Sequence, residues 1–196
     1  MFARLLILFY AIVSYAVFFV STLYAIGFVG NFRVPKSIDT GAPASLGDAI
    51  VIDLLLLGIF AIQHSIMARP AFKRWWATIF PTAGQRSTYV LLSSLILLLL
   101  FWQWRPIPIP VWLVEGIAAW LLIGVFWLGW AITFASSYMI NHFELFGLRQ
   151  AFLALRGAEV PGQSFRTPLL YKVVRHPIML GFLLASWPGC ISRNGI

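Results

Sequence analysis

LLILFYAIVSYAVFFVSTLYAIGFV, residues 5–29, is an apolar stretch that only hydroxyl groups and one glycine interrupt. A helix needs about 20 apolar residues to cross the hydrocarbon core of a bilayer. A cleavable signal peptide has a shorter apolar region, roughly 7–15 residues, followed by a cleavage site of small residues. We therefore expect residues 5–29 to form a retained membrane-spanning helix.

The composition indicates the same class of protein. Hydrophobic residues make up 61% of the 196 residues, charged residues only 10%, and the mean hydropathy is +0.89, values that exclude a soluble globular domain with a polar surface. The net charge of +8 comes from cations scattered between apolar runs, which fits membrane topology and not nucleic-acid binding. The single cysteine, Cys190, excludes an intramolecular disulfide framework.

Further apolar runs follow the first one. They lie at about 49–67, 88–104 and 111–136, with a last, partial run at about 177–189, in which the stretch from Ile178 to Pro188 is about half the length needed to cross a bilayer. Residues 143–156 place apolar side chains at helical spacing opposite polar ones, which predicts an interfacial amphipathic helix. The expected fold is an all-α integral membrane protein with four full transmembrane helices, a short incomplete fifth and the interfacial helix.

We expect residues 1–196 to form a single membrane domain in the lipid bilayer, and the basic residues predict its orientation. They follow the second and fourth runs or precede the first, while the remaining loops hold few. By the positive-inside rule, the N-terminus and both basic loops lie in the cytoplasm. His64, His142 and His176 then lie at the same side of the membrane, and polar groups near membrane depth tend to be functional.

Thr167 to Gly181, TPLLYKVVRHPIMLG, joins a basic segment to the last apolar run. Proline fixes its own φ and disfavours a helical conformation in the residue before it, so Pro177 is expected to begin a helix after an extended His176. The first amides of that helix and the Arg175 guanidinium would form a site for a carboxylate or a phosphate. The alternative is that these cations only anchor a transmembrane helix.

The three histidines also raise the question of a metal site, because imidazole binds zinc, iron and copper. No two of them form a local pair such as i, i+4 on one helix. We therefore predict no metal.

Three stretches resemble a known family: QHSIMAR (63–69), INHFELFGLRQ (140–150) and YKVVRHPIMLG (171–181). They are similar to the bacterial methanethiol S-methyltransferases, within the NnrU-like and isoprenylcysteine carboxyl methyltransferase-like membrane proteins. The resemblance implies binding of S-adenosyl-L-methionine. The residues to which it assigns this role are Tyr171, Arg175, His176, Pro177 and Gly181.

The reaction that the resemblance implies is transfer of the sulfonium methyl group to methanethiol, a small thiol, which gives dimethyl sulfide at the cytoplasmic face of the bacterial inner membrane. Thiolate is the competent nucleophile, and alignment of the reacting atoms supplies most of the rate. Histidine has an unperturbed pKa near 6.5 and can accept the thiol proton. His64 and His142 are the two candidate bases, and the sequence does not decide between them.

Two features depart from the family pattern. Ile178 and Met179 stand where relatives usually have an aromatic residue after the proline. The resemblance also implies that relatives continue beyond position 196 with segments that complete the cofactor pocket, so we expect a truncated chain with reduced activity. Two alternatives remain open: a non-catalytic NnrU-like membrane protein of nitrogen-oxide metabolism, and a carboxyl methyltransferase for a lipidated substrate.

Overall fold

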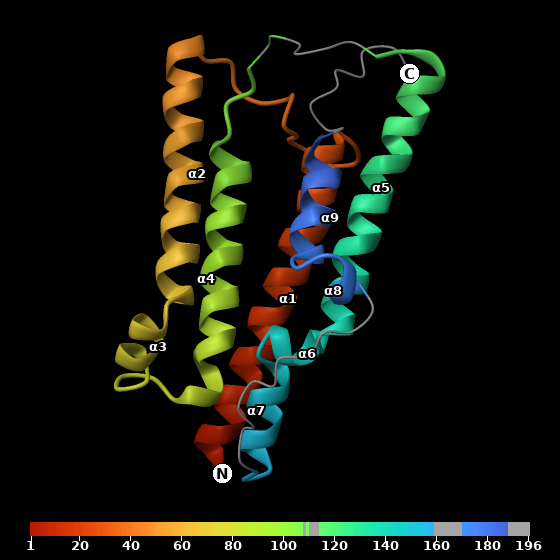
Figure 1. Ribbon diagram of the computed structural model, residues 1–196. Helices are drawn as coiled ribbons and strands as arrows, with labels where there is room; N and C mark the ends of the chain where they lie inside the picture. The colour runs from red at the N-terminus through yellow and green to blue at the C-terminus, as the bar shows by residue number, and fades with distance from the viewer. Residues whose placement is uncertain (108, 110–113, 159–169, 188–196) are drawn as a thin grey trace. The chain divides into compact units, whose positions relative to one another are not determined.

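The computed structural model describes residues 1–107, 109, 114–158 and 170–187, and in these residues every regular secondary-structure element is a helix, without strands (Figure 1). The described helices are α1 (Phe2–Gly30), α2 (Leu46–Ala68), α3 (Pro70–Trp76), α4 (Thr82–Gln103), α5 (Gly116–Met139), α6 (His142–Leu145), α7 (Leu148–Leu155), α8 (Leu170–Val173) and α9 (Pro177–Ser186).

Four of the described helices, α1, α2, α4 and α5, are long and apolar enough to cross a membrane. The ten-residue α9 is apolar but shorter. These helices confirm the predicted fold class, an all-α multi-pass membrane protein with four full-length spans and a shorter fifth apolar helix. The predicted start of the fourth span, at 111, lies outside the described residues.

Local sequence accounts for several helix boundaries. The Ser45 hydroxyl accepts a hydrogen bond from the Asp48 amide at 3.2 Å and donates to its carboxylate at 2.7 Å, an N-cap arrangement at the start of α2. Pro70 stands in the first turn of α3, where its missing N–H costs nothing. The helices therefore begin where the chain can satisfy or omit the first amide donors.

The chain divides into two compact units, which we describe separately. Unit 1 comprises 1–23, 51–103 and 142–164, and unit 2 comprises 24–50, 104–141 and 165–196. The single membrane domain expected from the sequence stays a prediction.

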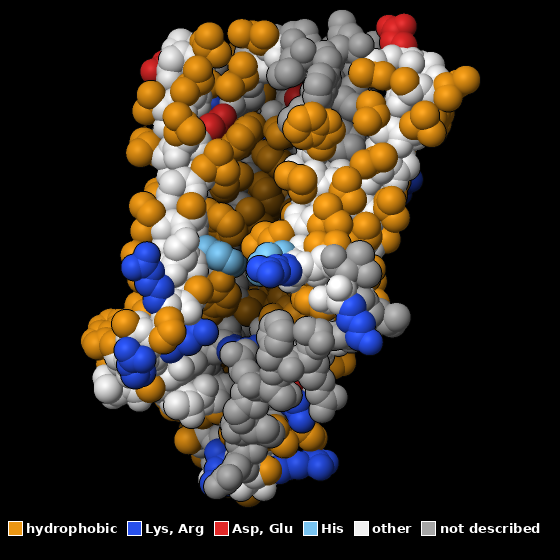
Figure 2. All heavy atoms as spheres, in the orientation of Figure 1, with side chains coloured by type: hydrophobic (Ala, Val, Ile, Leu, Met, Phe, Trp, Pro, Cys, Tyr) orange, Lys and Arg blue, Asp and Glu red, His pale blue; other side chains and the backbone are white. Residues whose placement is uncertain are grey.

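In unit 1, polar pairs join the long helices. The Tyr10 hydroxyl on α1 donates to Thr88 Oγ1 on α4 at 3.1 Å, and the Ser93 hydroxyl on α4 donates to Gln63 Oε1 on α2 at 3.2 Å. Hydrophobic side chains cover the outer surface of α2, and Lys and Arg side chains gather over α3 (Figure 2). The exposed cations there are Arg69, Lys73 and Arg74. This distribution matches an apolar span followed by a basic interfacial segment.

Residues 143–156, expected as one amphipathic helix, contain a sharp turn between α6 and α7. Gly147 stands there at φ 91°, in the left-handed region that favours glycine. A Cβ at this position would lie 2.6 Å from Ser87 Oγ and 2.9 Å from Ser87 N. The turn therefore brings the α6–α7 segment against α4, and only glycine permits both the conformation and the approach.

In unit 2, the loop after α1 is held by side chain to backbone hydrogen bonds. Tyr24 Oη donates to the Lys36 carbonyl and Trp104 Nε1 donates to the Ile38 carbonyl, each at 3.0 Å. The other main element of the unit is the pair α5 and α9, which contact each other directly (Figure 1).

Candidate functional site

The Arg175–His176–Pro177 turn of unit 2 links α8 to α9. His176 has φ −135° and ψ 67°, outside the helical region, and α9 begins at Pro177. The Leu180 amide donates to the His176 carbonyl at 3.0 Å, which is the first hydrogen bond of the helix. The expected helix start at Pro177 is confirmed.

The charges of this turn favour an anion. Arg175 and His176 are both exposed, and the side chain of His176, the N-cap residue of α9, makes no capping hydrogen bond. The Ile178 and Met179 amides precede the first intrahelical bond, so they remain available as donors at the positive end of the helix dipole. A carboxylate or phosphate group fits this combination of an exposed guanidinium and free first-turn amides.

Two further residues proposed for cofactor binding lie beside this turn. Tyr171, on α8, is partly buried, and this burial raises the pKa of its hydroxyl, so the phenol is neutral at pH 7. Gly181, on α9, is buried against α5, where a Cβ would lie 2.7 Å from the Gly129 carbonyl oxygen and 2.8 Å from the Thr133 amide nitrogen. Gly181 therefore has a packing role in the described structure.

His142 of unit 1 lies within an aromatic cluster. Its side chain is 5% exposed, and its Nε2 lies 2.8 Å from the Tyr15 hydroxyl. The ring packs edge-on against Phe143 and Phe146, with centroid distances of 5.6 and 4.7 Å. Burial lowers the pKa of His142 below its usual 6.5, so the imidazole is neutral at pH 7 and has one ring nitrogen able to accept a proton.

His64 of unit 1 lies near the end of α2, facing α4. The Tyr89 hydroxyl is 2.8 Å from its Nε2 and 2.9 Å from its Nδ1, and the ring stacks on Phe60 at 5.4 Å. Each histidine proposed as a base in unit 1 thus has a tyrosine from another helix as its hydrogen-bond partner, whereas His176 belongs to unit 2.

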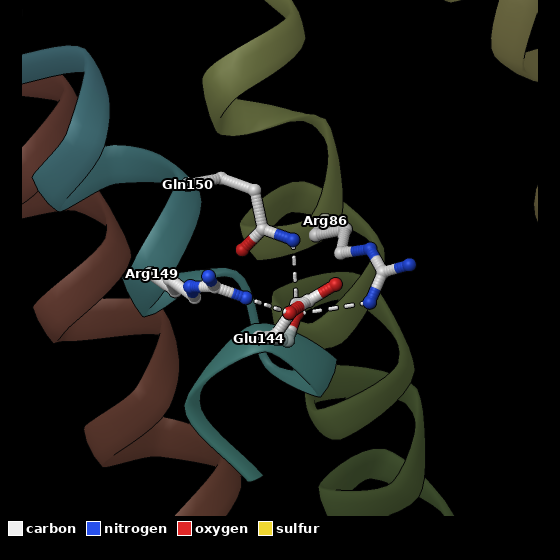
Figure 3. A network of polar contacts seen from close by, with 4 residues as sticks. All are labelled: Arg86, Glu144, Arg149 and Gln150. Atoms are coloured by element: carbon white, nitrogen blue, oxygen red, sulfur yellow. Dashed lines mark hydrogen bonds and ion pairs between the residues drawn. The ribbon is translucent and has the colours of Figure 1, made fainter. Parts of the chain in front are cut away.

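A network of polar contacts centres on Glu144 of α6 (Figure 3). Its backbone carbonyl accepts hydrogen bonds from Arg86 Nη1 at 2.9 Å and from Gln150 Nε2 at 3.0 Å, and its carboxylate forms an ion pair with Arg149. Arg86 comes from α4, so the network ties the α6–α7 segment to that helix. These hydrogen bonds hold the backbone carbonyl of Glu144, two residues after His142.

Within the described ranges, no group of three or more His, Cys, Asp or Glu residues is arranged to hold a metal ion.

A comparison with protein families matches residues 53–188 to the family described as "NnrU protein". The chain belongs to the NnrU protein family. Among its curated relatives is "Methanethiol S-methyltransferase 2" of Bradyrhizobium diazoefficiens, which is 76% identical over 95% of this chain and 72% of the relative.

Two other relatives of this NnrU family chain carry similar names. "Methanethiol S-methyltransferase" of Mycobacterium tuberculosis is 53% identical over 94% of this chain and 76% of the relative. The protein of the same name from Pseudomonas deceptionensis is 50% identical over 94% of this chain and 71% of the relative. No solved structure matches the chain.

Sequence reasoning missed the tyrosine partners of both histidines in unit 1. Tyr15 precedes His142 by 127 positions and Tyr89 follows His64 by 25, and neither spacing follows a local pattern. It also missed Gly129, the partner of Gly181 on α5. The sequence does contain a pattern that indicates this contact: Gly129 and Thr133 are four residues apart, which is the small-residue spacing typical of contacts between membrane helices.

Proposed function

We propose that this chain is an S-adenosyl-L-methionine-dependent thiol S-methyltransferase that converts methanethiol to dimethyl sulfide. The observation that carries the proposal is the 76% identity, over 95% of the chain, to a relative named methanethiol S-methyltransferase. The anion-compatible turn at Arg175 supports it, because S-adenosyl-L-methionine carries an amino-acid carboxylate.

The proposed cofactor-binding residues are Tyr171, Arg175, His176, Pro177 and Gly181. In this assignment Arg175 pairs with the carboxylate, and Pro177 begins the helix whose free amides face the same group. Gly181 contributes by allowing α9 to pack closely on α5. When bound, the cofactor supplies a sulfonium carbon that is electrophilic without any acid catalysis.

The remaining task of the protein is to favour the thiolate, the nucleophilic form of the thiol. His142 is neutral because burial lowers its pKa, so it is competent to accept a proton at pH 7. His64 is the second candidate base. Each candidate base has a tyrosine hydroxyl as a hydrogen-bond partner, Tyr15 for His142 and Tyr89 for His64.

We also propose that the chain lies in a bacterial cytoplasmic membrane with its N-terminus in the cytoplasm. The support is the distribution of basic residues, which are concentrated in the segments after the second and fourth spans. Cofactor and thiol would then both be taken from the cytoplasm.

The test is calorimetric titration of the detergent-solubilised protein with S-adenosyl-L-methionine. Arg175→Ala should weaken binding by about 2 to 3 kcal/mol, the range of a charge-assisted hydrogen-bonded pair. Arg74→Ala, which removes an exposed arginine from α3, is the matched control and should leave the affinity unchanged. Equal affinities of the wild type and Arg175→Ala would show that Arg175 does not bind the cofactor and contributes only to the orientation of the chain in the membrane.

A further inference from the structure

The helices α5 and α9 of unit 2 approach with their backbones in contact. A Cβ added at Gly129 would lie 2.6 Å from the Gly181 carbonyl oxygen and 2.9 Å from Ala185 Cα. A Cβ at Gly181 would likewise collide with Thr133. Such distances leave no room for a side chain, as in other membrane helix pairs that meet through small residues.

These approaches also define the register of the two helices. Gly129 meets Ala185, whereas Thr133, one turn later on α5, meets Gly181, one turn earlier on α9. The helices are therefore antiparallel. By the helical repeat, one further turn in the same direction corresponds to Ser136 on α5 and to Pro177, in the first turn of α9, and both residues are buried.

Ser136 lies on the side of α5 that faces α9. It follows Gly129 by seven residues and Thr133 by three, and both spacings return to the same side of a helix with 3.6 residues per turn. Its side chain is 0% exposed. The hydroxyl is therefore enclosed within the protein and does not face lipid or water.

The Ser136 hydroxyl has no hydrogen-bond partner among the described residues. The Thr133 hydroxyl on the same helix donates to the Gly129 carbonyl at 3.0 Å, and the buried Ser21 hydroxyl on α1 donates to the Phe18 carbonyl at 2.8 Å. Leaving a buried hydroxyl unsatisfied costs free energy. A partner supplied by a ligand would recover that cost.

We propose that Ser136 is a further binding residue of the cofactor site, whose hydroxyl donates a hydrogen bond to the carboxylate held by Arg175 and the first-turn amides of α9. The identity of the ligand, S-adenosyl-L-methionine, rests on the proposed function. Three kinds of donor then surround the same anion: a guanidinium, the amides of Ile178 and Met179, and the Ser136 hydroxyl.

The experiment compares Ser136→Ala with Ser21→Ala by calorimetric titration, using S-adenosyl-L-methionine and its decarboxylated analogue. Ser136→Ala should weaken binding of S-adenosyl-L-methionine by about 10- to 150-fold, the value of one hydrogen bond to a charged group, and leave binding of the analogue unchanged because the analogue lacks the carboxylate. Ser21→Ala should leave both affinities unchanged.

Thermal stability without ligand provides a second readout. Removal of an unpartnered hydroxyl should leave the melting temperature of Ser136→Ala unchanged or higher, because no native hydrogen bond is lost. A purely structural role predicts the opposite, a lower melting temperature with unchanged affinity. That result, or equal losses of affinity for both ligands, overturns the proposal.

The wild-type titration separates failure of this inference from failure of the proposed function. If the wild type binds S-adenosyl-L-methionine and Arg175→Ala weakens it while Ser136→Ala does not, only the role of Ser136 is wrong. If the wild type binds neither ligand, the cofactor assignment and the role of Ser136 both fail.

Discussion

At the scale of single residues, the environment of each histidine defines what it can do. His142 is enclosed by aromatic rings and hydrogen-bonded to Tyr15, which favours the neutral imidazole. His176 is exposed in the turn before α9. The buried ring suits proton acceptance, and the exposed ring lies beside the donors of the proposed cofactor site.

The lowered pKa of His142 predicts how stability depends on pH. Because the folded pKa lies below the usual 6.5, the unfolded chain binds the proton more readily, and stability falls as pH drops through 6.5. We expect the melting temperature to decrease between about pH 7.5 and about pH 5.5, and His142→Phe to reduce this slope.

The control for this prediction is His176→Asn, which removes an exposed imidazole. The measurement is the melting temperature in detergent across that pH range, without ligand. An identical slope for the wild type and His142→Phe would show that the proton uptake during unfolding belongs to another group.

The sequence predicted where α9 begins, but not the tertiary contacts of the proposed site residues. The start of α9 at Pro177 followed from the backbone restrictions of proline alone. The pairing of Tyr15 with His142 depends on two segments 127 positions apart, and no local pattern carries that information. The position of Gly181 against Gly129 has the same origin in tertiary packing.

At the scale of elements, the packing of α5 against α9 determines where the proposed binding turn lies within unit 2. Pro177, Gly181 and Ala185 are four residues apart on α9 and are all buried. On α5, the corresponding buried positions are Gly129 and Thr133. Any change that separates these faces displaces the Arg175 turn.

Gly129→Ala tests this packing. We expect a loss of stability of about 1 to 3 kcal/mol, the usual cost of overpacking, because the added Cβ meets the backbone of α9, which cannot rotate away. The affinity for S-adenosyl-L-methionine should fall with it. Thermal unfolding and calorimetric titration of the same preparation measure both effects.

Gly124→Ala is the matched control on the same helix, because nothing lies within 4 Å of a Cβ built at that position. Alanine there should be neutral or stabilising, since it is the better helix former. If the two variants were equally stable, α5 and α9 would not pack as described.

The sequence predicted the long elements from their apolar length and could not predict the break between α6 and α7. The pattern over residues 143–156 continues through Gly147, and a glycine inside a helical pattern is tolerated often enough not to end it. The left-handed conformation of Gly147 occurs where its backbone packs closely against Ser87 of α4. This contact with a neighbouring helix cannot be read from the local sequence pattern.

At the scale of the whole molecule, apolar composition decides the class of protein and the basic residues predict its orientation. Labelling of introduced cysteines tests that orientation. The loop residue Ala42 and Ala77, just after α3, are both exposed, whereas Ser37 is only 3% exposed and would be shielded from the reagent. The background variant is Cys190→Ser.

Ala42→Cys should react with a membrane-impermeant maleimide in intact cells, and Ala77→Cys only after permeabilisation, because the positive-inside rule puts the segment after the second span in the cytoplasm. The reverse pattern would place the N-terminus outside and remove the argument that the three histidines lie at the cytoplasmic side.

Methyl transfer itself is the central claim, and it is tested most directly by supplying membranes that contain this chain with methanethiol and methyl-labelled S-adenosyl-L-methionine. Labelled dimethyl sulfide is then measured in the headspace by gas chromatography. The Bradyrhizobium diazoefficiens relative is the positive control, and Arg175→Ala is the negative one. We expect labelled product that requires the thiol, the cofactor and Arg175; a signal no higher than in membranes without the protein, while the relative is active, would contradict the account.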